Sequence, residues 1–97
     1  MSNDLNGRRG DETLLQQARG DDTDAFVELA ARWWASVSRI ASNMLGNVDE
    51  ATVSTEEALR SELRSAGPSD APFGTSLHRR AIRLTLARRR SALRDVA

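Results

Sequence analysis

The chain has 97 residues, of which 39% are hydrophobic, 29% are charged and 4% are aromatic. This length allows one small domain with a thin hydrophobic core. Cysteine is absent, which excludes disulfide bonds and thiolate metal sites. The single histidine has no second histidine to help it hold a metal, so we expect no metal site, no cofactor and no enzymatic activity.

No uncharged run approaches the ~20 apolar residues that a membrane-spanning helix needs. The first residues also lack a basic start followed by an apolar stretch, which is the pattern of a secretory signal. We therefore expect a cytoplasmic protein with no membrane partner and no small-molecule substrate. Its function should be to bind other macromolecules.

The net charge of zero hides a strong asymmetry along the chain. Residues 1–75 carry seven arginines and thirteen acids, a net charge of −6, whereas residues 76–97 carry seven arginines and one acid, a net charge of +6. A clustered positive segment attracts polyanions, while an acidic body suits a different partner. The alternative is an arginine-rich helix face that is simply exposed to water.

Hydrophobic spacing predicts helices in the first half of the chain. A short helix should run from Asp11, as its cap, to Ala18, with Gly20 ending it. A long helix should begin at Asp22, Thr23 and Asp24, which supply caps and negative charge at its start, and end at Gly46. Its apolar stripe is formed by Phe26, Leu29, Ala30, Trp33, Val37, Ile40, Ala41 and Met44. The neighbouring Trp34 lies about 100° from Trp33 around a helix, so one indole should be in the core and the other at the rim or on a partner surface.

The second half predicts two more helices. Ser54 and Glu57 have the spacing of a capping box, which places the start of the third helix at Ser54, and the Gly67–Pro68 pair should end it. A loop over 66–72 leads to a fourth helix from about Phe73 to Leu93. We therefore expect an all-α, compact bundle of about four helices, with a flexible arm at 1–10, a domain at 11–92 and the start of a linker at 93–97.

Several short motifs occur in a specific order along these expected helices. They are Asp11-Glu12-Thr13-Leu14, Ala18-Arg19-Gly20-Asp21, Ala25-Phe26-Val27-Glu28-Leu29, Leu45-Gly46, the acidic segment 49–62, and Phe73, Leu77 and Ala81 followed by arginines. In this order they resemble the second conserved region of bacterial sigma factors, in particular the extracytoplasmic-function group. The resemblance covers about Asp11 to Arg90 and implies a sigma region-two-like fold.

The chain departs from the pattern of that family at five positions. Thr55 stands where glutamine is usual, and Ser76 stands where tryptophan is usual. Arg83 replaces an asparagine, and two aromatic positions hold Ala58 and Glu62. Large aromatic groups commonly anchor protein interfaces, so these changes predict weak binding to polymerase, a variant partner or loss of initiation activity.

The resemblance implies two binding surfaces. One would dock on the clamp helices of the largest subunit of core RNA polymerase, through Asp49, Thr55, Glu56, Leu59 and Arg60. The other would contact the −10 element of promoter DNA, through Ser76, His78, Arg79, Arg80, Arg83 and Arg88. A pocket near the loop at 66–72 would hold a base flipped out of the non-template strand. An anti-sigma factor is a candidate third partner.

Two other functions compete with promoter recognition. The chain could be a sigma-like interaction module, a regulator or adaptor that no longer recognises promoters, or an unrelated helical module that binds nucleic acid without sequence preference. Local alternatives also exist, because Glu56 and Arg60 have the spacing of an intrahelical ion pair and His78 could be an exposed helix residue. The family's usual second domain, which reads the −35 element, is absent from this chain, so the chain is either an excised domain of a longer protein or a stand-alone relic. We expect an excised domain, because Arg88-Arg89-Arg90 leading to Ala97 resembles the beginning of a linker.

Overall fold

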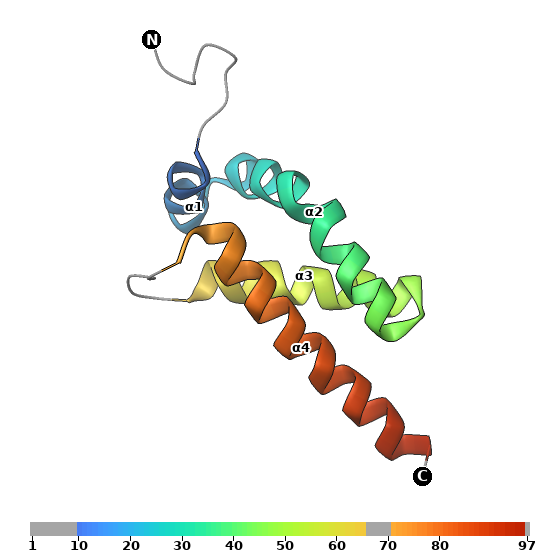
Figure 1. Ribbon diagram of the computed structural model, residues 1–97. Coiled ribbons are helices and arrows are strands. Elements are labelled where there is room, and N and C mark those ends of the chain that lie inside the picture. The colour runs from blue at the N-terminus through green and yellow to red at the C-terminus, as the bar shows by residue number, and fades with distance from the viewer. Residues whose placement is uncertain (1–9, 66–70, 97) are drawn as a thin grey trace.

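The computed structural model describes residues 10–65 and 71–96, which form four helices and no strand. The helices are α1 (Asp11–Arg19), α2 (Thr23–Leu45), α3 (Val48–Arg64) and α4 (Phe73–Val96) (Figure 1). The expected all-α bundle of about four helices is confirmed. In Figure 1 the short α1 lies beside the start of α2, and the C-terminal part of α4 extends past the other helices. Within the described ranges, no helix has both the length and the apolar character needed to cross a membrane.

The caps of α2 are those that the sequence predicts. The Asp22 carboxylate accepts a hydrogen bond from the backbone N–H of Ala25 at 3.1 Å. At the other end, Gly46 adopts the left-handed conformation with φ 65°, and its N–H donates to the Ser42 carbonyl. Glycine takes this conformation without the strain that a Cβ atom would cause, which explains why α2 ends there.

The predicted cap of α1 is wrong. Gly10 precedes the helix, no side chain caps it, and Asp11 is its first residue. The Asp11 carboxylate instead accepts a hydrogen bond from Arg32 of α2, with Nη1 and Oδ1 2.8 Å apart. The acid therefore joins α1 to α2. Gly20 follows the last residue of α1, as expected.

The predicted start of α3 is also wrong. The helix begins at Val48, and the Asn47 side chain caps it by accepting from the backbone N–H of Glu50 at 2.9 Å. Ser54 is buried inside the helix, where its hydroxyl shares a hydrogen bond of 2.7 Å with the Thr85 hydroxyl of α4. A capping box at Ser54 is therefore excluded. The predicted stop at Gly67–Pro68 lies outside the described residues, and α4 runs to Val96 rather than ending near Leu93.

All four helices contribute to one hydrophobic core. Its buried side chains include Leu14, Leu15, Leu29, Val37, Ala58, Leu59, Phe73, Leu77 and Ala81. The partly buried Trp33 packs against this core, with its ring centroid 6.4 Å from that of Phe73. The next indole, Trp34, lies at the α2–α3 surface described below. Both indoles are partly buried and pack against the core, so the expected division into one core and one surface tryptophan is not seen, although only Trp34 lines the α2–α3 surface.

A substitution at Gly74 of α4 tests the packing of Trp33 against the core. A Cβ atom at position 74 would overlap the indole ring of Trp33, which Phe73 and His78 hold in place. We expect Gly74→Ala to lower the free energy of unfolding by about 1–3 kcal/mol through overpacking. Urea denaturation followed by tryptophan fluorescence measures the loss. Gly20→Ala is the control, because a Cβ there makes only ordinary contacts, and a loss at Gly20 equal to that at Gly74 would contradict the packing argument.

Candidate functional site

Four arginines of α4 point away from the core on one side of the helix. At about 100° per residue, Arg79, Arg83, Arg90 and Arg94 fall within about 60° of each other and span about 22 Å along the axis. All four are exposed, and none forms an ion pair within the described part of the chain. We call these four residues the arginine stripe. Near its start, Ser76, Arg79, Ile82 and Arg83 line a shallow depression of about 430 Å³.

Two of the expected DNA contacts face α3 instead. Arg80 Nε lies 2.7 Å from Glu62 Oε1, and Arg80 Nη1 donates to the Ser61 hydroxyl at 2.9 Å. Arg88 lies about 180° from Arg79 around α4, on the side opposite the arginine stripe. Arg80 is thus paired with one carboxylate of α3 and Arg88 with two, and contact of either arginine with DNA stays a prediction.

Arg88 is held by two acids of α3. Its Nη1 donates to Glu50 Oε1 at 2.9 Å, and its Nε lies 3.5 Å from Glu57 Oε1, an ion pair without a hydrogen bond. These two carboxylates are 55% and 49% exposed, so water screens both pairs. Because α3 begins at Val48 and not at Ser54, Asp49 and Glu50 lie in its first turn and not in the segment before it.

Ser76 and His78 also have partners within the chain. The Ser76 hydroxyl donates to Glu62 Oε2. His78 Nδ1 lies 2.7 Å from the Gly74 carbonyl oxygen, which can only accept, so Nδ1 carries a proton. His78 Nε2 lies 2.7 Å from the Ser36 hydroxyl of α2. His78 is therefore a bridge between α2 and α4, not the free surface residue that the sequence suggested.

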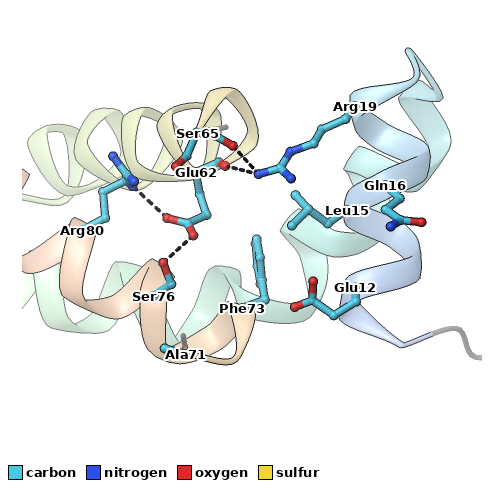
Figure 2. Close-up of a pocket in the computed structure, with 10 residues that line it drawn as sticks. All are labelled: Glu12, Leu15, Gln16, Arg19, Glu62, Ser65, Ala71, Phe73, Ser76 and Arg80. Carbon is cyan, nitrogen blue, oxygen red and sulfur yellow. Dashed lines mark hydrogen bonds and ion pairs between the residues drawn. The ribbon is translucent and has the colours of Figure 1, made fainter. Parts of the chain in front are cut away.

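Glu62 lies at the edge of a pocket between α1, α3 and α4, shown in Figure 2. The pocket has a volume of about 460 Å³ and is lined mainly by polar side chains above Leu15 and Phe73. On the α1 side, Arg19 donates to the carbonyls of Leu63, Glu62 and Ser65 and so caps the C-terminus of α3. No local sequence pattern indicates this role of Arg19, because its acceptors are backbone atoms more than 40 residues away.

A groove runs along the seam between α2 and α3, with Trp34 at its centre. Its apolar half has a volume of about 300 Å³ and is lined by Phe26, Val27, Ala30, Ala31, Trp34, Glu56, Leu59 and Arg60. A second hollow of about 410 Å³ continues from Trp34 towards Arg39, Val48 and Thr52. We call the two together the α2–α3 groove. The Arg60 guanidinium lies 6.0 Å from the centre of the Phe26 ring, within the range of a cation–π contact.

The residues expected to bind polymerase divide between this groove and the interior. Glu56 and Arg60 are exposed and line the groove, and Leu59 forms part of its floor although it is buried. Thr55 is fully buried and its hydroxyl donates to the Ala51 carbonyl at 2.7 Å, so its role as a docking contact is excluded. Asp49 is exposed but is not among the residues lining the groove. No ion pair joins Glu56 to Arg60 in the described residues; Arg60 lies over Phe26 instead.

The described residues hold no group of three or more histidines or acids placed to bind a metal ion. Comparisons with protein-family models, with curated proteins and with solved structures find no match to this chain.

Replacing Arg80 should lower the stability of the domain much more than replacing its neighbour Arg79. Removing Arg80 leaves the Glu62 carboxylate, whose side chain is 7% exposed, without its cation. We expect Arg80→Ala to lower the free energy of unfolding by about 1.5–3 kcal/mol, the usual cost of losing a hydrogen bond to a buried charge. Arg79→Ala should change it by less than about 0.5 kcal/mol, because Arg79 is on the surface. Urea denaturation measures both, and equal effects would contradict the orientation of α4.

Proposed function

We propose that this domain is part of a transcription initiation factor that acts in the cytoplasm, where it binds core RNA polymerase and recognises and melts the −10 element of promoters. The proposal draws on the ordered motifs that resemble region two of extracytoplasmic-function sigma factors. The observation that supports it most directly is the arginine stripe, which presents four unpaired guanidinium groups on one exposed face of α4.

The stripe suits a nucleic-acid backbone. No acid occurs between Phe73 and Arg94 in the sequence of α4, and Asp95 is the one acid of the helix, so positive charge predominates along the stripe. Arginine binds phosphate with paired hydrogen bonds, and each neutralised phosphate releases counterions. The pocket of Figure 2, at the end of α3 and the start of α4, lies where a flipped base would be held under this proposal. Its Phe73 floor and polar rim suit the face and edge of a base.

The α2–α3 groove suits a protein partner. Its lining is mainly apolar, with one indole at the centre and the charged groups of Glu56 and Arg60 at the edge. Such a surface can accept the apolar face of a helix, and tryptophan and arginine are frequent anchors in protein interfaces. Under this proposal the groove receives the clamp helices of the largest polymerase subunit.

A second candidate function is a sigma-like interaction module that has lost promoter recognition. The observation that favours it is the internal bonding of Ser76, His78, Arg80 and Arg88, four of the six residues expected to contact DNA. Such a module would keep the α2–α3 groove and bind polymerase or a regulator without binding DNA. Binding to DNA separates the two candidates, whereas both of them predict that the groove binds a protein.

The double variant Arg79→Ala/Arg83→Ala tests the nucleic-acid surface. If the stripe binds phosphates, it should weaken binding to a single-stranded −10-like oligonucleotide and make the plot of log affinity against log salt shallower by up to about 1.4. Fluorescence anisotropy at several salt concentrations measures both. Arg39→Ala on α2 is the control for a lost positive charge elsewhere. An unchanged slope in the double variant would exclude DNA binding by the stripe, and equal affinity for unrelated sequences would exclude promoter recognition.

Val27→Asp tests the groove. Val27 lines the apolar half of the groove and is 58% exposed, so the variant should fold but place a charge where the partner packs. We expect binding to core RNA polymerase, measured by biolayer interferometry, to weaken roughly tenfold or more. Leu93→Asp on α4 is the matched control, because Leu93 is 63% exposed and lies outside the groove. Equal binding by the two variants would rule out the groove as the docking surface.

A further inference from the structure

The carboxylate of Glu62 is almost fully enclosed, and both its oxygens are engaged. Oε1 accepts from Arg80 Nε at 2.7 Å, and Oε2 accepts from the Ser76 hydroxyl. The Glu62 side chain is 7% exposed, whereas that of Arg80 is 24% exposed. The pair thus joins a carboxylate of the interior to an arginine at the margin of the surface. Figure 2 shows the Arg80 and Ser76 side chains pointing toward this carboxylate.

Arg80 lies close to the arginine stripe. At about 100° per residue it is about 60° from Arg83 around α4 and about 40° from Arg94. Its long side chain could therefore reach a polyanion that lies on the stripe. In the structure it turns the other way, towards α3, where the Ser61 hydroxyl also accepts from it.

We propose that Glu62 limits the affinity of this domain for nucleic acid by holding Arg80 in an internal ion pair. The inference depends on the proposed function, because it concerns the same surface of α4. A phosphate could take Arg80 only by leaving a buried carboxylate without its cation, which is costly. Arg80 therefore adds no phosphate contact in the wild-type chain. Because phosphate contacts carry no sequence information, Glu62 reduces sequence-independent binding and favours selectivity for particular bases.

The exposed ion pairs of Arg88 differ from the Glu62–Arg80 ion pair in two respects. The carboxylates of Glu50 and Glu57 are about half exposed, so breaking these pairs returns them to water at little cost. Arg88 also lies on the side of α4 opposite the stripe, where a polyanion bound to the stripe does not reach it. Glu62 is therefore the acid whose removal should release an arginine to the ligand.

Glu62→Gln is the direct test, because glutamine keeps the shape and the hydrogen-bonding oxygen but removes the charge. The probe is a fluorescent single-stranded DNA oligonucleotide of mixed sequence, titrated by anisotropy over a salt series. We expect Glu62→Gln to bind more tightly at low salt, with a log–log slope steeper by about 0.7, the contribution of one additional phosphate contact on single-stranded DNA.

Glu12→Gln is the matched control. Glu12 lines the same pocket and carries the same charge, but it is exposed and makes no contact with Arg80. Its removal should leave the slope at the wild-type value. Slopes that are equal in wild type, Glu62→Gln and Glu12→Gln would overturn the proposal. Equal steepening in both variants would also overturn it, because that result would reflect net charge rather than release of Arg80.

Circular dichroism shows whether Glu62→Gln folds. If it does not, the double variant Glu62→Gln/Arg80→Gln provides the test. Both charges are removed together, so no buried charge is left unpaired. We expect its slope to equal that of wild type, and a shallower slope would mean that Arg80 already contacts phosphate. If wild type binds and Arg79→Ala/Arg83→Ala flattens its slope while Glu62→Gln changes nothing, only this inference fails. If wild type does not bind the oligonucleotide, the proposed function fails and this inference with it.

Discussion

Polar contacts between α3 and α4 fix how α4 is rotated about its own axis, and the character of its surface follows from that rotation. The contacts occur at three levels along the helix: Glu62 with Ser76 and Arg80, Ser54 with Thr85, and Glu50 and Glu57 with Arg88. Apolar side chains tolerate small shifts, but turning α4 would leave the buried hydroxyls of Ser54 and Thr85 unpaired. One orientation is therefore strongly preferred.

This orientation determines which arginines are available to a partner. Residues 76–97 carry a net charge of +6, but the acids of α3 neutralise Arg80 and Arg88. Of the five arginines that remain, four form the arginine stripe on the side of α4 away from the core, and the fifth, the exposed Arg89, lies about 80° from Arg79 around the helix. The positive field that a ligand meets is thus narrower than the sequence charge suggests and has a defined direction. A partner that recognises it must be elongated along the helix axis, because the stripe is about 22 Å long and about 60° wide.

The sequence predicted the parts of the fold that depend on neighbouring residues. Asp22 and Gly46 bound α2 as expected, because a cap involves only the adjacent turn. Ser54 was misassigned because a serine followed three residues later by a glutamate satisfies a local pattern, whereas its actual partner, Thr85, is 31 residues away. The pairing of Arg80 with Glu62 could not be predicted from the sequence either, because it depends on how α3 and α4 cross. Arg90 and Arg94 could have been found, since their angular distance from Arg79 follows from numbering alone.

The internal contacts also change how the departures from the sigma pattern are understood. Glu62 and Ser76 both stand at positions where that pattern has aromatic residues, and considered separately each suggests a lost anchor. In the structure the two side chains are hydrogen-bonded to each other, and Arg80 completes the group. The two departures are therefore matched, because the residues at both positions form one polar contact where α3 and α4 cross. Because these contacts hold the crossing of α3 and α4, α4 presents the arginine stripe to solvent, and the absence of aromatic residues at positions 62 and 76 is not in itself evidence against binding by that face.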